Sequence, residues 1–294
     1  MFHSSFKTWI LAARPKTLWA AVAPVIIGTA MAYGDAKVHW LSAALAALGA
    51  VFIQIGTNFA NDYYDHLHGA DEGERLGPLR ATQAGLVKPR TMKTATIIAF
   101  TLAFIAGIYL IYRGGLPILI IGLFSILFGV LYTGGPFPLG YYGLGDIFVL
   151  IFFGFVAVGG TYYVQALEIN RMVLLAGVAP GLFSMAILTV NNFRDINTDR
   201  EAGKKTLAVR FGETFARLEY LLSVTVACLI PVVLCLLAPG HFFVLIASLG
   251  LLLAIPSIRL VFREKPGVVF NKVLADTGKL LLIFSLLFAI GWNL

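Results

Sequence analysis

The stretch NFANDYYDHLHGAD (58–71) gathers acids and amides directly behind an apolar run, in a spacing that could bind a metal ion. If the preceding helix continues for a turn or two, Asn58, Asp62 and Asp65 share one helix face, because residues four and seven apart lie above one another. Oxygen ligands suit Mg²⁺, which proteins usually hold through one or two carboxylates plus substrate phosphates. The stretch is therefore predicted to bind Mg²⁺ together with a phosphate-bearing substrate.

A second stretch, NNFRDINTD (191–199), repeats the arrangement after another apolar run. A continued helix would align Asn191, Asp195 and Asp199 in the same way. Both stretches lie near predicted helix C-termini, where the helix dipole disfavours carboxylates, so a cation should offset the cost. Two such groups facing each other could hold a pair of Mg²⁺ ions around a diphosphate. The similarity of the two stretches also suggests duplicated halves within one domain.

Basic residues around both stretches are candidate phosphate ligands. Arginine offers bidentate contacts to phosphate, and lysine offers a point charge. A diphosphate at a membrane surface indicates a lipid diphosphate, whose isoprenoid tail would lie among the spans. The candidate cations are Arg14, Lys16, Arg80, Arg194, Arg200, Lys204 and Lys205.

The surrounding chain is typical of a membrane protein. Its 294 residues are 59% hydrophobic and 13% charged, with a mean hydropathy of +0.86, whereas a soluble domain is about 25% charged. Nine apolar segments approach the roughly 17–25 residues that span a bilayer. We therefore predict one all-α integral membrane domain over residues 1–294. The predicted spans are 18–34, 40–60, 94–112, 116–132, 144–165, 172–190, 218–238, 241–262 and 276–293.

The distribution of basic residues predicts the orientation in the membrane. Most of the 22 lysines and arginines fall in loops on the N-terminal side, and only Lys37, Arg113 and Arg171 fall in the opposite loops. The positive-inside rule then places the N-terminus and both acidic stretches in the cytoplasm. The net charge of +7 is mostly a topology signal. Nucleic-acid binding is not expected, because no soluble domain carries the basic residues.

Four strings, in order along the chain, resemble the UbiA-type intramembrane prenyltransferases. The two acidic stretches alone indicate that superfamily. The loop strings are most similar to its branch that prenylates 1,4-dihydroxy-2-naphthoate in menaquinone biosynthesis. The resemblance runs from Arg14 to about Arg217, and the last three spans match only as apolar helices. The strings are NFANDYYDHLHGAD (58–71), GPLRATQAGLV (77–87), YTGGPFPLGYYGLGDIFVLIFFG (132–154) and NNFRDINTDREAGKKTLAVRFG (191–212).

The resemblance implies a fold and a reaction. The fold would be nine transmembrane helices around a central cavity, with the Asp-motif loops forming a cytoplasmic cap. The reaction would be the Mg²⁺-dependent transfer of a polyprenyl group from polyprenyl diphosphate to 1,4-dihydroxy-2-naphthoate. Carbon dioxide and diphosphate would leave, and demethylmenaquinol would form in a bacterial inner or plasma membrane.

The resemblance also implies site residues. The metal and diphosphate positions match Asp62, Asp65, Asp195 and Asp199. The broader superfamily pattern has an acid where this chain has Gly69, so Asp71 is only a secondary candidate. The substrate-binding candidates are Asn58, Asn61, Asn191, Arg14, Lys16, Arg80, Arg200, Lys204 and Tyr132.

Several side chains allow two interpretations. Tyr132, Phe137, Tyr141 and Tyr142 could stabilise an allylic cation with their ring faces, or they could belong to the aromatic belt at the membrane interface. Asp146 is either a favourable acid in a first helical turn or the residue that orients the acceptor phenol. The sequence leaves both questions open.

Two other functions fit parts of the sequence. A UbiA-type enzyme could use another aromatic acceptor, such as 4-hydroxybenzoate, haem, chlorophyllide or homogentisate. An ion-coupled secondary transporter would explain the many spans and the repeat. Transporters, however, place ionisable groups near the membrane midplane, and the predicted spans are almost free of acids away from their ends.

Overall fold

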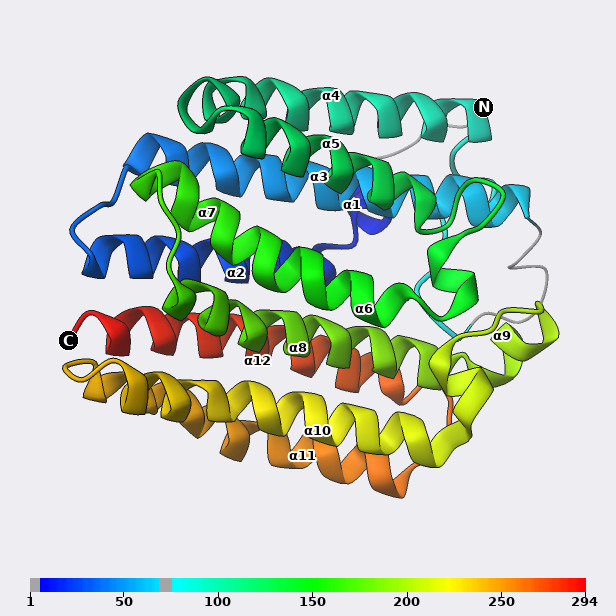
Figure 1. Ribbon diagram of the computed structural model, residues 1–294. Helices are drawn as coiled ribbons and strands as arrows, with labels where there is room; N and C mark the ends of the chain where they lie inside the picture. The colour runs from blue at the N-terminus through cyan, green and yellow to red at the C-terminus, as the bar shows by residue number, and fades with distance from the viewer. Residues whose placement is uncertain (1–5, 69–75) are drawn as a thin grey trace.

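The computed structural model describes residues 6–68 and 76–294, and every regular element within them is a helix. The long helices lie side by side as a bundle, with α4 and α5 on one side and α10 and α11 on the other (Figure 1). The elements are α1 (Phe6–Ala13), α2 (Pro15–Gly34), α3 (Trp40–Leu67), α4 (Pro89–Gly114), α5 (Leu116–Leu131), η1 (Leu139–Tyr142), α6 (Gly145–Val149), the π-helical η2 (Leu150–Val156), α7 (Ala157–Ala166), α8 (Arg171–Arg194), α9 (Ile196–Glu201), α10 (Leu207–Leu237), η3 (Phe242–Leu249), α11 (Gly250–Arg263) and α12 (Phe270–Trp292).

Eight stretches of the described residues are long and apolar enough to cross a membrane. One of them, Gly145–Ala166, joins α6, η2 and α7, and another, Phe242–Arg263, joins η3 and α11. The predicted segment 116–132 is the helix α5, which has only 16 residues and is shorter than the other eight. The prediction of an all-helical membrane protein is confirmed, and all nine predicted apolar segments are helical.

Local sequence explains where several helices begin. Pro15 and Pro89 start α2 and α4, where the missing backbone N–H would have no helical partner in any case. The side chains of His39, Asn170 and Thr206 accept backbone N–H groups at the starts of α3, α8 and α10. These caps satisfy donors that would otherwise be orphaned.

Glycines bring η2 and α8 into close contact. A Cβ added at Gly154 would come 2.7 Å from the Gly177 carbonyl oxygen, and one at Gly181 would come 2.7 Å from the Leu150 carbonyl oxygen. Small residues allow such close approach between helices in a membrane. The contact aligns α6 with the C-terminal half of α8, where a Cβ at Gly145 would come 3.1 Å from the Leu188 side chain.

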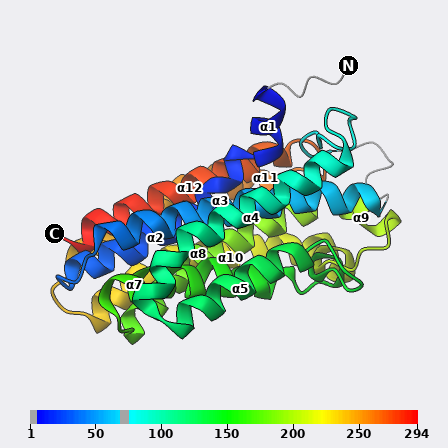
Figure 2. The ribbon, with the colours of Figure 1, turned by 90° about the horizontal axis from the view of Figure 1, so that it is seen from above.

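The loops that carry the predicted chemistry gather at one end of the bundle. The end of α3, the connection from α5 to α6, and α9 lie together there, whereas the C-terminus lies at the opposite end (Figure 1). Seen from above, the long helices remain aligned and α1 projects from the bundle (Figure 2). Residues that are distant in sequence therefore meet at this end, which we call the motif end.

Candidate active site

The first acidic stretch lies on the last turns of α3, which continues to Leu67. Asn58, Asp62 and Asp65 are buried, with exposed fractions of 3%, 2% and 2%. The predicted continuation of the helix is thus confirmed, and the three side chains share one face. Asp71 and Gly69 lie outside the described residues.

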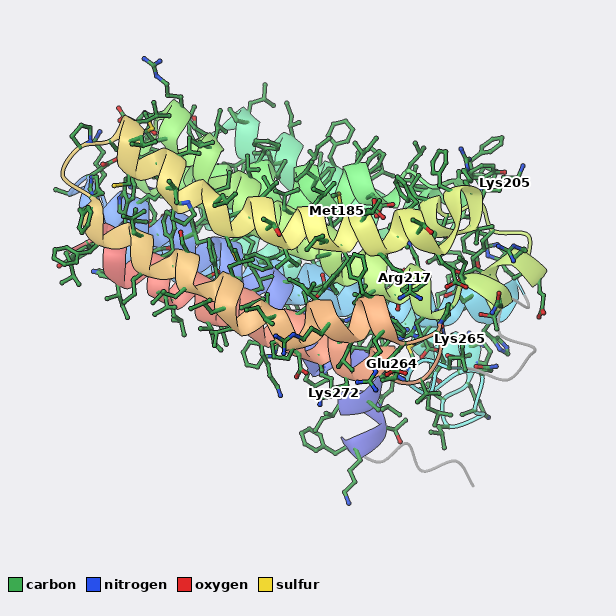
Figure 3. All side chains as sticks on the ribbon, turned by 90° about the horizontal axis from the view of Figure 1, so that it is seen from below. Met185, Lys205, Arg217, Glu264, Lys265 and Lys272 are labelled. Carbon is green, nitrogen blue, oxygen red and sulfur yellow. The ribbon has the colours of Figure 1, made fainter. Side chains whose placement is uncertain are left out.

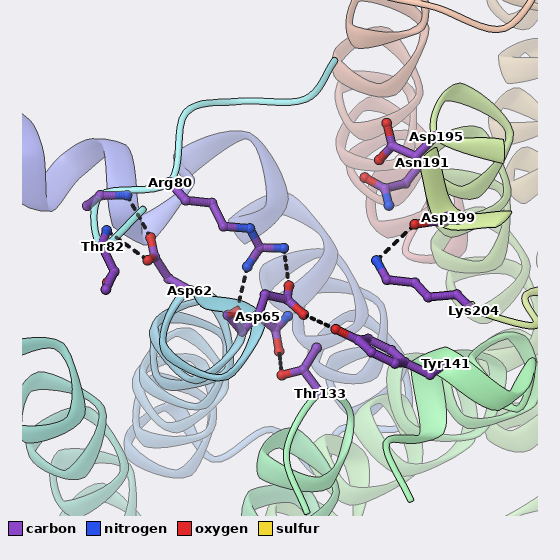
Figure 4. Close-up of polar contacts among 12 residues, drawn as sticks. Asp62, Asp65, Arg80, Thr82, Thr133, Tyr141, Asn191, Asp195, Asp199 and Lys204 are labelled. Carbon is purple, nitrogen blue, oxygen red and sulfur yellow. Dashed lines mark hydrogen bonds and ion pairs between the residues drawn. The ribbon is translucent and has the colours of Figure 1, made fainter. Parts of the chain in front are cut away.

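Asp62 is bonded to a distant loop. Its Oδ2 accepts the backbone N–H of Ala81 at 2.8 Å, and its Oδ1 accepts that of Thr82 at 3.0 Å. Charge-assisted hydrogen bonds of this kind are stronger than neutral ones. Asp62 therefore holds the loop that carries Arg80 against the end of α3 (Figure 4).

Asp65 faces cations and a phenol instead. Arg80 forms an ion pair with its carboxylate, and the Tyr141 hydroxyl donates a hydrogen bond to its Oδ1 at 2.6 Å. Arg80 also donates to the Asn61 carbonyl oxygen at 2.5 Å, and Thr133 donates to the Asn61 side chain at 2.8 Å. The loops after α3 and α5 are thereby tied to one carboxylate (Figure 4).

The second acidic stretch differs from its prediction, because the helix does not continue through it. α8 ends at Arg194, and Asp195 takes a non-helical conformation with φ −97° and ψ 12°. Asp199 therefore belongs to a separate short helix, α9. The predicted single face for Asn191, Asp195 and Asp199 is wrong, because this turn re-aims the second acid.

Arg194 binds Asp195, the first aspartate of this stretch. It is 2% exposed, and it donates to both oxygens of Asp195 at 2.8 and 2.6 Å. It also donates to the side-chain oxygens of Asn191 and Asn271, each at 2.8 Å. Asn271 in turn donates to the Leu76 carbonyl oxygen at 2.7 Å. Arg194 thus joins α8, α12 and the loop after α3.

Asp199 faces the same region as Asp65. The Lys204 ammonium lies 2.8 Å from its carboxylate and 4.9 Å from the centre of the Tyr141 ring. Burial raises the pKa of Asp199, Lys204 opposes this, and the carboxylates of Asp195 and Asp65 reinforce it. Asp65 and Asp199 are therefore close enough to interact, with Tyr141 and Lys204 between them (Figure 4).

The donor set fits a metal that shares its ligands with a substrate. Among residues 6–68 and 76–294, no group of three or more His, Cys, Asp or Glu side chains is placed to hold a metal ion by itself. Mg²⁺ usually needs only one or two carboxylates when substrate phosphates complete its shell. Asp65 and Asp199 fit that description, whereas Asp62 and Asp195 already have partners for both oxygens.

The remaining predicted residues divide by location. Asn58 donates to the Ala13 carbonyl oxygen at 2.9 Å and to the Thr17 hydroxyl at 3.1 Å, which ties α3 to the start of α2. The Arg14 and Lys204 charges both act on Asp65. By contrast, Lys16, Arg200 and Lys205 are all exposed and are not buried at the meeting point of the two acids.

An apolar cavity begins at this polar region. It has a volume of about 250 Å³ and is lined by α2, α3, α4, α5 and the α6–α7 unit. Tyr132 lines it, and the hydroxyl of Tyr132 interacts with the carboxylates of Asp65 and Asp199. The cavity walls include Thr57, Phe128, Phe148 and Phe152. A polar head and an apolar tail could therefore bind in adjacent spaces.

Sequence reasoning missed three contributors. Thr133 lies in the string after α5, but nothing in its sequence context marks its bond to Asn61. Asn271 lies in the last third of the chain, which carries no motif, and only the fold brings it to Arg194. Glu219 lies within α10 and interacts with Thr189 and Asp146; an acid inside an apolar helix is a signal that could have identified it.

The chain is similar to known proteins over nearly its whole length. A sequence model of the UbiA prenyltransferase family matches residues 21–275. A 1,4-dihydroxy-2-naphthoate octaprenyltransferase of Escherichia coli (strain K12) is 40% identical over 98% of this chain and 96% of the relative. One from Mycobacterium tuberculosis (strain ATCC 25618 / H37Rv) is 39% identical over 96% of each chain.

The fold is also similar to that of a solved structure. A UbiA homologue from Archaeoglobus fulgidus, bound to DMAPP and Mg²⁺, superposes with a TM-score of 0.68. The superposition covers 97% of this chain and 99% of that chain, at 16% sequence identity. At that identity the comparison shows a shared fold.

Proposed function

We propose that this chain, which belongs to the UbiA prenyltransferase family, transfers a polyprenyl group from polyprenyl diphosphate to 1,4-dihydroxy-2-naphthoate. Carbon dioxide and diphosphate leave, and demethylmenaquinol forms, as a step of menaquinone biosynthesis. Two bacterial enzymes named for this acceptor support the proposal, because their alignments cover 98% and 96% of this chain.

The proposal rests on one observation. The ion pairs of Asp65 and Asp199 lie beside Tyr132, and Tyr132 lines an apolar cavity. A diphosphate needs positive charge, and an isoprenoid tail needs apolar surface. Arg80 and Lys204 supply the charge beside Asp65 and Asp199. Tyr132 lies where the two environments join, since it lines the cavity and interacts with both carboxylates.

Mg²⁺ is the proposed cofactor, with two ions bridging the diphosphate. The homologue bound to DMAPP and Mg²⁺ supports the metal, and the carboxylate donors suit its chemistry. We assign Asp65 and Asp199 as the primary ligands, and Asp62 and Asp195 as ligands that join only if they release their present partners. Bound Mg²⁺ would neutralise the charge that develops on the leaving diphosphate.

The basic side chains near the two carboxylates are proposed to bind the diphosphate. Arg80 pairs with Asp65, so a diphosphate that binds Arg80 would free Asp65 for the metal. Lys204 can make the same exchange between Asp199 and a phosphate oxygen. Arg14 adds charge beside Asp65, and the exposed Lys16 and Arg200 complete the proposed set at its edge.

Aromatic faces are proposed to stabilise the allylic cation as its C–O bond loosens. Such contacts are worth about 0.5–2 kcal/mol each. Tyr132 lines the cavity, and Tyr141 already faces the Lys204 ammonium. Phe137 and Tyr142 are 71% and 40% exposed, which suits the interfacial belt instead. Tyr132 is therefore the leading aromatic candidate of the four.

The proposed topology has the N-terminus and the active site in the cytoplasm. Nine spans, with α5 counted, would put the two termini on opposite sides of a bacterial inner or plasma membrane. Lys205, Arg217, Lys265 and Lys272 lie at the same end of the molecule (Figure 3). The positive-inside rule favours the cytoplasm for that end.

A reconstitution assay tests the reaction. Purified protein in detergent receives Mg²⁺, a mixture of polyprenyl diphosphates and one acceptor, and mass spectrometry identifies the product. Prenylated naphthoquinol should form only when all three components are present. Product from 4-hydroxybenzoate but not from 1,4-dihydroxy-2-naphthoate would overturn the acceptor, and no product from any aromatic acceptor would overturn the proposal.

A further inference from the structure

A buried acid without a complete set of partners lies beside the cavity. Asp146 is 3% exposed, and its Oδ1 has no hydrogen-bond partner among the described residues. A favourable position in the first turn of α6 explains why an acid is tolerated there, but it leaves this oxygen unpaired. Burying an unpaired polar atom is costly, and such atoms in a folded protein call for an explanation.

Tyr132 stands between this acid and the cavity. Its ring lies in a slot between two glycines, since a Cβ at Gly140 would come 3.0 Å from its Cε1 and one at Gly145 would come 3.0 Å from its hydroxyl oxygen. The hydroxyl is thereby held at the residue that precedes Asp146. A tyrosine phenol is protonated at neutral pH and can therefore donate a hydrogen bond.

Three aromatic rings, those of Phe128, Phe148 and Phe152, line the same cavity as Tyr132. The centroids of Phe128 and Phe148 are 4.7 Å apart, and those of Phe148 and Phe152 are 6.2 Å apart with nearly parallel planes. All three residues line the cavity. Offset and edge contacts between rings favour a planar aromatic ligand on such a wall. An aromatic acceptor placed there would bring its hydroxyl toward Tyr132.

We propose that Asp146 is a positioning residue for the aromatic acceptor and acts through Tyr132. When the acceptor binds, the Oδ1 atom of Asp146, which has no partner among the described residues, accepts the hydrogen bond of the Tyr132 hydroxyl, and this turns the lone pairs of the Tyr132 oxygen toward the cavity. That oxygen then accepts the hydrogen bond of an acceptor hydroxyl. An acceptor hydroxyl that donates in this way releases more electron density into its ring, which favours attack on an allylic cation. The inference rests on the proposed function.

The other acid near Asp146 supports this arrangement. Glu219 approaches from α10 and interacts with both Asp146 and Thr189. Two neighbouring carboxylates repel each other in a buried site. Asp146 therefore gains from a hydrogen-bond donor, and the Tyr132 hydroxyl lies next to Gly145, the residue that precedes Asp146.

Two variants of nearly unchanged side-chain shape test the inference, Asp146→Leu and Tyr132→Phe, because each removes one partner of the proposed hydrogen bond. Equilibrium binding of 1,4-dihydroxy-2-naphthoate, measured by calorimetry without Mg²⁺ or prenyl diphosphate, should weaken about tenfold in each variant. The double variant should bind no more weakly than Tyr132→Phe alone, because Asp146 acts only through Tyr132. In turnover, KM for the acceptor should rise while KM for polyprenyl diphosphate stays within about twofold.

Acceptor analogues locate the hydrogen bond. Of 1-hydroxy-2-naphthoate and 4-hydroxy-2-naphthoate, the analogue that lacks the relevant hydroxyl should bind the wild type and both variants equally. Tyr162→Phe is the matched control, because the buried Tyr162 donates to the exposed Asp35 at 2.5 Å, at the opposite end of the α6–α7 unit. That control should leave acceptor binding unchanged.

Each other result overturns the inference. Unchanged acceptor binding in Asp146→Leu, additive losses in the double variant, or parallel losses for both substrates would each exclude a positioning role. A lower unfolding temperature with equal loss for all three acceptors would indicate a structural role only. The proposed function fails separately, if the wild type itself neither binds nor prenylates 1,4-dihydroxy-2-naphthoate.

Discussion

The two acidic stretches resemble each other in sequence but differ in how the fold uses them. In the first, α3 continues through the stretch, and Asp62 and Asp65 lie on one helix. In the second, α8 ends before Asp195, and Asp199 belongs to α9. In both stretches the first aspartate has partners for both carboxylate oxygens, and the second pairs with a cation from a loop, Arg80 or Lys204.

The difference lies in which donors bind the first aspartate of each stretch. Asp62 accepts two backbone N–H groups from the loop at Ala81 and Thr82. Asp195 binds the guanidinium of its neighbour in sequence, Arg194. The first stretch therefore positions a loop that carries a cation, whereas the second stabilises the junction of three elements. Equal spacing of residues does not imply equal roles, and variants can separate the two.

The largest effect is expected where the two stretches agree. Asp65→Asn or Asp199→Asn should lower kcat/KM by about 10²–10³-fold, because each removes a carboxylate from the proposed metal and diphosphate site. The loss of kcat/KM is measured from product formation, followed by mass spectrometry over a range of Mg²⁺ concentrations. Full activity in either variant would contradict the assignment of that residue.

Arg194→Met should separate stability from substrate binding. The change leaves Asp195, whose side chain is 20% exposed, without its cation, and it leaves the side-chain oxygens of Asn191 and Asn271 without this donor. Breaking a fully buried pair costs about 3–5 kcal/mol, which is an upper limit for this pair. The unfolding temperature in detergent should therefore fall clearly. Arg263→Met is the matched control, because the side chain of Arg263 is 86% exposed and its removal should leave the unfolding temperature unchanged. A normal unfolding temperature for Arg194→Met would remove the distinction between the stretches.

Asp62→Asn should loosen the loop that carries Arg80. An amide can accept only one of the two N–H groups, and the lost charge-assisted bond is worth about 1.5–3 kcal/mol. Hydrogen exchange at the Ala81 and Thr82 amides should accelerate, and kcat/KM should fall about tenfold. Asp65→Asn is the control, because it should leave those amides protected. Protected amides in Asp62→Asn would show that the loop is held by other contacts.

The smallest effect concerns the pH dependence of folding stability at Asp199. Because burial raises the pKa of Asp199, this carboxyl stabilises the fold fully below its unfolded pKa of about 3.9, and that stability is lost as pH rises through the folded pKa. Asp199→Asn cannot ionise, so it should raise the unfolding temperature by a few degrees at pH 7. The gain should disappear near pH 3. Lower stability at pH 7 would mean that the Lys204 pair outweighs burial.

Much of the fold could be predicted because it follows from solvent and composition. All nine apolar segments became helices, since only helices and closed barrels satisfy backbone groups in lipid. The continuation of α3 through Asp65 was also predictable from helix periodicity. The break after Arg194 was not, because Asp195 leaves the helix to meet a guanidinium that also binds α12.

The sequence by itself determined the membrane class, the two acidic stretches and the family, since composition, spacing and short strings are properties of the chain. Only the tertiary structure decided which aspartates have partners for both carboxylate oxygens and which pair with Arg80 or Lys204. Asp62 and Asp65 are three residues apart and equally buried, yet one meets backbone N–H groups and the other meets Arg80. The physical reason is that a carboxylate takes its role from the donors around it, and those donors come from loops that are distant in sequence.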